Sequence, residues 1–166
     1  MEVRRTYGYS VNALALQLDG KIVMDGSMQV PCPSDPSHSF RDGLARLNSD
    51  SPYFSVDPSF DAGSGPGDVP GGYQSVSDIA IQPDGKILVG GAFASFNGQP
   101  RLGVVRLNSD GSLDPSFVTD WSALSPTLNV SVNRVALQPD GRILIAGGFN
   151  YSGNYYYPAY YRLFHK

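Results

Sequence analysis

SVSDIAIQPDGKILVGGAF, residues 75–93, is the stretch of sequence that decides the fold, because the chain contains a version of it three times. The other copies are SVNALALQLDGKIVMDGSM at 10–28 and SVNRVALQPDGRILIAGGF at 131–149. A second phrase follows each copy: LARLNSD at 44–50, VVRLNSD at 104–110 and a degenerate YYRLFHK at 160–166. Repetition at a period this long is typical of propellers and solenoids, in which each copy forms one supersecondary unit.

The spacing of the copies indicates where the sequence tolerates insertions. Asp19 and Asp84 are 65 positions apart, whereas Asp84 and Asp140 are 56 apart. The additional residues lie between the apolar phrases and never within them, as expected for loops on a fixed scaffold. We therefore expect residues 1–166 to form one domain. Its repeats are expected at about 8–74, about 75–130 and about 131–166.

Each copy is expected to form a β-hairpin followed by a third strand. Apolar residues alternate with polar or small ones over 76–81, which is the pattern of a strand. The Pro-Asp-Gly-Lys segment 83–86 predicts a turn whose glycine takes a positive φ, and the apolar run 87–89 resumes at once. Gly-Gly at 90–91 indicates a close backbone approach or a bulge. Val-Val-Arg-Leu at 104–107 is the expected third strand.

The fold-class prediction is all-β: three antiparallel β-sheet blades of a β-propeller, closed by self-association. Three or four antiparallel strands per copy, repeated at this period, fit propeller blades. A weaker fourth strand is expected in 113–117 or in the segment after it, and the glycine-rich segment 63–72 is expected to be a loose loop. An extended β-solenoid is the rival, but its coils are usually shorter and lack this hairpin chemistry. No segment has the pattern of a helix.

The repeated phrase and its continuation RLNSDGSLDPSF at 106–117 closely resemble the delta-60 repeat family of bacterial surface and secreted proteins. The similarity covers nearly the whole chain and is strongest in 75–117 and 131–149. It implies a β-propeller, and it supplies no catalytic residues. Because closed propellers typically have about four to eight blades, three copies imply that further blades come from a partner.

Composition and charge argue against several classes of function. A net charge of −3 offers no basic surface for nucleic acid. The sequence contains no run of 18 or more apolar residues, the length needed to span a membrane. The opening residues 1–6 are not followed by the apolar core of a signal peptide. Localisation stays unknown. The chain is expected either to be made in the cytoplasm and incorporated into a virion or surface assembly, or to have lost a leader. The single cysteine, Cys32, excludes an internal disulfide framework.

No catalytic or metal-binding constellation is recognisable in the sequence. The only histidines, His38 and His165, can form neither a histidine-rich metal site nor a triad. Aspartates recur at the expected hairpin ends: Asp19, Asp50, Asp84, Asp110 and Asp140. We expect them to cap Asx turns; calcium is the alternative, but no loop has the D-x-[DN]-x-[DN]-G spacing. The sequence thus predicts no enzyme activity, no cofactor and no metal.

An arginine recurs inside the third strand of each copy, at Arg46, Arg106 and Arg162. A planar guanidinium can bind several fixed acceptors at once. We therefore expect these arginines to make ion pairs or carbonyl contacts between blades, with a ligand site as the alternative.

The feature outside the repeats that suggests a partner surface is a strip of six tyrosines: Tyr151, Tyr155, Tyr156, Tyr157, Tyr160 and Tyr161. Tyrosine offers apolar area together with a hydroxyl, which suits a protein partner or a sugar. Packing between blades is the structural alternative for the same residues.

The sequence therefore favours a non-enzymatic structural or interaction module. Its expected partner is another copy of itself, in a homodimer with six blades or, as the second possibility, a homotrimer. Other proteins of a large assembly, such as a virion, are further candidate partners. A carbohydrate- or surface-binding lectin is the alternative function.

Two structural details follow from this hypothesis. Residues 2–8 are expected to add a strand to the blade formed by residues 131–164, because such closure removes an exposed sheet edge. The outer faces of the first and third blades are expected to expose apolar side chains. These are Leu14 and Leu16 in the first copy and Val135 and Leu137 in the third.

Overall fold

A computed structural model gives the arrangement of the chain. It describes six ranges: 10–28, 41–49, 55–67, 74–119, 129–151 and 155–163. These ranges contain strands, turns and bends and no helix, as the all-β prediction requires. They accordingly include no helix long and apolar enough to cross a lipid bilayer.

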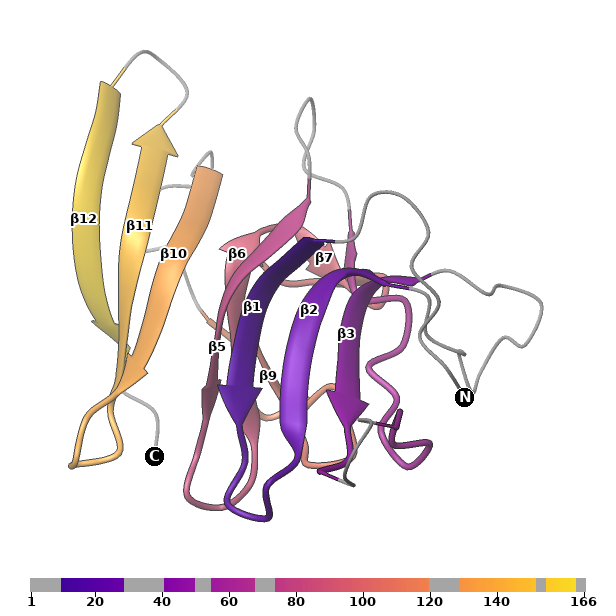
Figure 1. Cartoon of the computed structure of the whole chain (residues 1–166). Helices are drawn as coiled ribbons and strands as arrows, with labels where there is room; N and C mark the ends of the chain where they lie inside the picture. Colours follow the sequence, from indigo (N-terminus) through magenta and orange to yellow (C-terminus); the bar gives the residue numbers. More distant parts are fainter. Residues whose placement is uncertain are drawn as a thin grey trace.

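Each of the three copies forms an antiparallel three-stranded blade (Figure 1). The first blade consists of β1 (Ser10–Leu16), β2 (Ile22–Met28) and β3 (Arg41–Leu47). The second consists of β5 (Ser75–Ile81), β6 (Ile87–Ala92) and β9 (Val104–Leu107). The third consists of β10 (Asn129–Leu137), β11 (Ile143–Tyr151) and β12 (Tyr155–Leu163). A single bridge, Ser131 to Ala92, joins the second and third blades. The described blades stand side by side and do not close into a ring.

The hairpin between the first two strands of each blade has the predicted turn. Gly20, Gly85 and Gly141 have φ values of +83°, +84° and +80°, which confirms the left-handed conformation expected after aspartate. The preceding aspartate accepts a backbone N–H two residues on, as in Lys86 N to Asp84 Oδ1 at 3.1 Å. The expected Asx capping is therefore present in all three turns.

The glycine pair at 90–91 makes the predicted close approach. The register of β5 and β6 shifts between Val76 and Asp78, and a side chain at Gly91 would overlap the carbonyl of Ser75 at this bulge. Gly26 and Gly147 occupy the same position against β1 and β10. The bulge thus recurs in every blade and requires a glycine opposite it.

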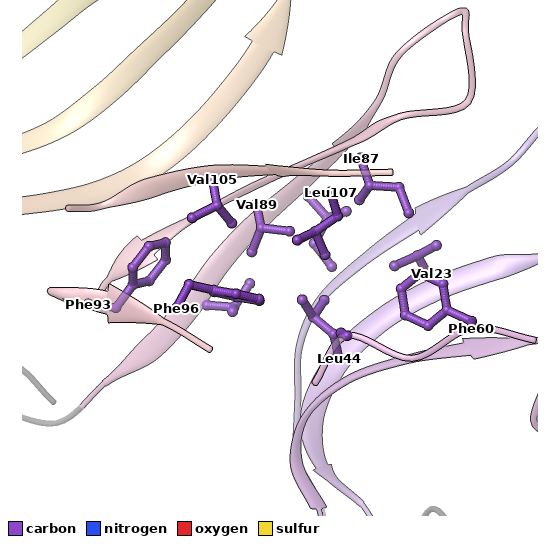
Figure 2. Close-up of a cluster of buried hydrophobic side chains, with 12 residues drawn as sticks. Val23, Leu44, Phe60, Ile87, Val89, Phe93, Phe96, Val105 and Leu107 are labelled. Atoms are coloured by element: carbon purple, nitrogen blue, oxygen red, sulfur yellow. The ribbon is translucent and has the colours of Figure 1, made fainter. Parts of the chain in front are cut away.

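Two apolar cores lie between consecutive blades. In the first core, Val23, Leu44 and Phe60 of the first blade meet side chains of the second (Figure 2). Their partners on the second repeat include Ile87, Val89, Phe93, Phe96, Val105 and Leu107. In the second core, Leu88 and Val104 of the second blade meet side chains of the third: Val130, Val132, Val135, Ile143, Ile145 and Phe149.

Alternate residues of each blade therefore point to different neighbours. We call the back face the one that meets the preceding blade, defined in the second blade by Val76, Ile79 and Ile81. The front face meets the following blade, defined in the second blade by Ala80, Leu88 and Val104. Every blade is stacked with the same polarity, because the third blade also turns its Val76- and Ile79-equivalents toward the blade before it.

This polarity corrects one prediction about exposed faces. Leu14 and Leu16 are exposed, as expected. Val135, however, is buried against the second blade, and Leu137 packs against the same core. The third blade uses these residues to contact its predecessor, so its outward-facing surface is the opposite face of the sheet.

The structure contains a small sheet outside the blades that the sequence did not lead us to predict. It joins β4 (Pro66–Gly67), β7 (Ser95–Phe96) and β8 (Gln99–Pro100). Part of the segment 63–72 is thus ordered as a strand rather than a loose loop, although 68–72 lie outside the described residues.

Two further strand predictions have different outcomes. Residues 113–117 form no fourth strand but contribute one bridge, Leu113 to Leu107, followed by a turn, and residues 120–128 of the segment after them lie outside the described residues. The proposed closing strand at residues 2–8 lies outside the described residues.

Candidate functional site

The recurrent arginine lies in a polar cluster at the end of each of the first two blades. In the first, Arg46 Nε and Lys21 Nζ both lie 2.8 Å from Asp57 Oδ2. The other carboxylate oxygen, Oδ1, accepts the backbone N–H of Ser59 at 2.9 Å and its hydroxyl at 2.7 Å. Arg46 Nη2 also donates to Ser59 Oγ at 3.1 Å. Both oxygens of Asp57 are therefore fully engaged.

The second blade repeats this cluster. Arg106 Nε and Lys86 Nζ each lie 2.8 Å from Asp114 Oδ2, and Ser116 donates its N–H and its hydroxyl to Asp114 Oδ1. The local cause is the sequence Asp-Pro-Ser-Phe, in which the aspartate caps the turn that follows it. Lysine, arginine, aspartate and serine form the cluster in both copies, which indicates that the cluster is a feature of the repeat.

An aromatic ring completes each cluster. The guanidinium carbon of Arg46 lies 5.0 Å from the centroid of the Phe60 ring, and Arg106 stands in the same relation to Phe117, also at 5.0 Å. Both phenylalanines are buried. In this cation–π contact the aromatic ring attracts the guanidinium, which stabilises a charged group beside the apolar core.

The electrostatics of the clusters favour ionised carboxylates. Burial by itself raises the pKa of Asp57, but hydrogen bonds from Lys21 and Ser59 and the charge of Arg46 outweigh it and hold that pKa far below its usual range. The pKa of Asp114 is lowered in the same way: burial opposes the shift, and the hydrogen bonds from Lys86, Ser116 and Arg106 exceed it. In each cluster a lysine and an arginine therefore compensate the charge of the buried aspartate.

The first cluster also reaches the next blade. Arg46 Nη1 donates to the backbone carbonyl of Ser109, in the turn after β9. Beside this contact the backbone N–H of Asp61 donates to the carbonyl of Asp110 at 2.9 Å. These bonds support the interpretation of the recurrent arginine as a carbonyl contact between blades. The equivalent contact of Arg106 would involve His165, which lies outside the described residues.

A further contact between blades, which the sequence interpretation missed, comes from Asp78. Its Oδ2 accepts the backbone N–H of Val135 in the third blade at 2.9 Å. Its register partner is Gly90, and the equivalent pair of the first blade is Ala13 with the buried Asp25. The equivalent pair of the third blade is Arg134 with Ala146, so a cation stands there instead of a carboxylate.

The structure describes the backbone of the predicted tyrosine surface. Tyr151 ends β11 and the other five tyrosines lie in β12, where Tyr157 pairs with Phe149 and Tyr161 with Ile145. The backbone therefore places the strip at a sheet edge, since β12 is the last strand in the order β12-β11-β10-β6-β5. The side chains of these tyrosines lie outside the described residues, as do Cys32, His38, Asp50, His165 and the side chain of Arg162.

The chemistry available to the two clusters is structural. The carboxylates, lysines and arginines are paired with one another, and the cations that could bind a ligand are directed into ion pairs. Within the described ranges no three histidine, cysteine, aspartate or glutamate residues come together as a possible metal site. The clusters can hold a turn on its blade and, through Arg46, one blade on the next.

Comparison with known families gives a match in the same repeats. Residues 82–117 and 138–157, about a third of the chain, match a family model described as a domain of unknown function (DUF5122), beta-propeller. The first matched segment contains the whole second cluster, from Lys86 to Phe117. A comparison with curated proteins finds no match. The stacked antiparallel blades and the partial match to this family model together support β-propeller repeats in this chain.

Proposed function

We propose that this chain is a non-enzymatic β-propeller module that works as a structural or interaction unit and associates with further copies of itself. Two observations support this proposal. The first polar cluster reaches the next blade through Arg46, and the cores between blades consist of aliphatic and aromatic side chains. The resemblance of residues 75–117 to the delta-60 repeat family agrees with a role in a surface assembly, and a virion or other large particle is a further candidate for such an assembly.

The observation that carries self-association is the exposed back face of the first blade. Val11, Leu14 and Leu16 are 52%, 64% and 68% exposed. Their equivalents in the second blade include Val76 and Ile79, which are 2% and 6% exposed because the first blade covers them. A contiguous apolar face of this kind is typical of an interaction surface.

Light scattering coupled to size-exclusion chromatography tests the proposal. At micromolar concentration we expect a homodimer, whose two chains supply six blades; a homotrimer is the second possibility. A monomer of 17.8 kDa that binds no hydrophobic dye would contradict self-association.

A lectin-like module is the alternative function, supported by the six tyrosines at the end of β11 and in the edge strand β12 of the third blade. Aromatic rings of this kind can stack on sugars. Screening the chain on a glycan array discriminates the two functions. Binding of a defined glycan that is lost on replacing Tyr156 and Tyr160 with alanine favours the lectin, whereas an array without signal favours the assembly module.

A further inference from the structure

We propose that self-association is head to tail: the back face of the first blade in one chain docks on the front face of the third blade in a second copy. This inference rests on the proposed self-association and adds its polarity and contact residues. The alternative arrangement is isologous, with the exposed back faces of two first blades packed against each other.

The polarity follows from continuity with the two interfaces inside the chain. At both of them the front face of one blade meets the back face of the next. The exposed first-blade face is a back face, so the surface that matches it is a front face. The front face without a following blade among the described residues belongs to the third blade, where Arg134 and Ala136 are exposed.

The contact residues can be deduced from the interface between the second and third blades. A Cβ at Gly90 would lie 2.8 Å from Cγ1 of Val132 and 2.8 Å from Cγ1 of Val135. The front-face position of Gly90 therefore sits directly against these two back-face valines. Its equivalent in the third blade is Ala146, by register with Arg134.

The equivalents of the two valines in the first blade are Val11 and Leu14. We therefore expect Ala146 of one chain to contact Val11 and Leu14 of the other. At the interface between the first and second blades the equivalent front-face position is the buried Asp25, so this stacking can also accommodate a side chain there. One chain carries both halves of the contact, which is why a second copy is the occupant to which the proposal commits.

Engineered disulfides test this pairing. All variants carry Cys32→Ser, so that the introduced thiols are the only ones. Leu14→Cys and Ala146→Cys are made separately and together, since their equivalents Val135 and Gly90 are in direct contact between the second and third blades, as a disulfide requires. Each protein is oxidised mildly at micromolar concentration and run on a non-reducing gel.

The head-to-tail arrangement predicts cross-linked chains in the double variant and none in either single variant. A closed pair gives a covalent dimer. Leu18→Cys combined with Ala146→Cys is the matched control, because Leu18 is 98% exposed but lies in the turn, away from the back face. This control is expected to stay uncross-linked.

The remaining outcomes separate the inference from the proposal beneath it. If Leu14→Cys alone cross-links, the arrangement is isologous; self-association then stands and the polarity is wrong. If the chain is oligomeric by light scattering but the double variant stays uncross-linked, the pairing is likewise overturned. If the chain is monomeric, the proposed self-association fails and the inference fails with it.

Discussion

Nη1 of Arg46, in the third strand of the first blade, donates a hydrogen bond to the main-chain carbonyl of Ser109 in the second. The same guanidinium binds Asp57 through Nε and lies over the ring of Phe60. One side chain thus connects its own strand, the turn that follows it and the neighbouring blade. This is how a repeat of about 60 residues can specify both its blade and its contact with the next.

Replacing Arg46 with methionine should lower the free energy of unfolding by roughly 3 kcal/mol, because Asp57 would keep its buried charge with only Lys21 to compensate it. Urea denaturation measures the change. Arg142→Met is the matched control: Arg142 pairs with Asp140 at the surface, so its loss should cost less than about 0.5 kcal/mol. Equal effects of the two substitutions would show that the buried cluster does not stabilise the fold.

Stability should decline in acid through Asp57 and Asp114. Their pKa values are lowered in the folded chain, so the unfolded chain binds protons more readily than the folded one. The free energy of unfolding is then at its full value above the ordinary aspartate pKa of 3.8 and falls as the pH drops below it. Urea denaturation at several pH values from 7 down to about 2 measures this slope. Asp57→Asn with Asp114→Asn should be less stable at pH 7 but show a shallower slope, and an unchanged slope would contradict the assignment.

Gly111 should tolerate alanine far less well than Gly98 does. Both have a positive φ, +93° and +69°, so both substitutions carry left-handed strain of roughly 1–2 kcal/mol. A Cβ at Gly111 would in addition lie 2.8 Å from the carbonyl carbon and oxygen of Asp61 in the first blade, whereas none of the described atoms lies within 4 Å at Gly98. We expect Gly111→Ala to cost roughly 2 kcal/mol more than Gly98→Ala in thermal or urea denaturation. Equal costs would mean that the loop around Asp61 yields freely.

Arg134→Asp should tighten association of the chain. Arg134 occupies the front-face position at which Asp78 accepts the N–H of Val135 from the following blade. An aspartate there could accept the N–H of Leu14 from a second copy, and a charge-assisted hydrogen bond of this kind corresponds to about a tenfold lower Kd. Analytical ultracentrifugation measures the Kd. Arg142→Asp, a matched change of charge in the turn, should leave the Kd unchanged, and equal effects of both would point to net charge rather than to this contact.

The hairpins could be predicted from the sequence because they depend on local chemistry. Asp84-Gly85 fixes a turn and the alternation around it fixes two strands, and the structure has both. Asn97-Gly98 carries the same kind of signal and forms the turn between β7 and β8, so the small sheet could have been found in the same way.

Contacts over long sequence separations were harder to predict. The recurrent arginine was expected to meet a carbonyl or an ion-pair partner, but Asp57 follows Arg46 by 11 positions and was hidden in a segment with the composition of a turn. The polarity of stacking was not predictable at all. Alternation shows that Val135 and Leu137 share a face, but it does not tell which neighbour that face meets.

The measurement that tests the central claim most directly is the molar mass in solution of the unaltered chain, of Leu14→Ser and of Leu18→Ser. The account predicts a mass of twice 17.8 kDa for the unaltered chain and for Leu18→Ser, because Leu18 lies outside the back face. Leu14→Ser should shift toward the monomer, since it removes an apolar side chain from the docking surface. A monomeric unaltered chain, or a dimer that Leu14→Ser leaves intact, would contradict the account.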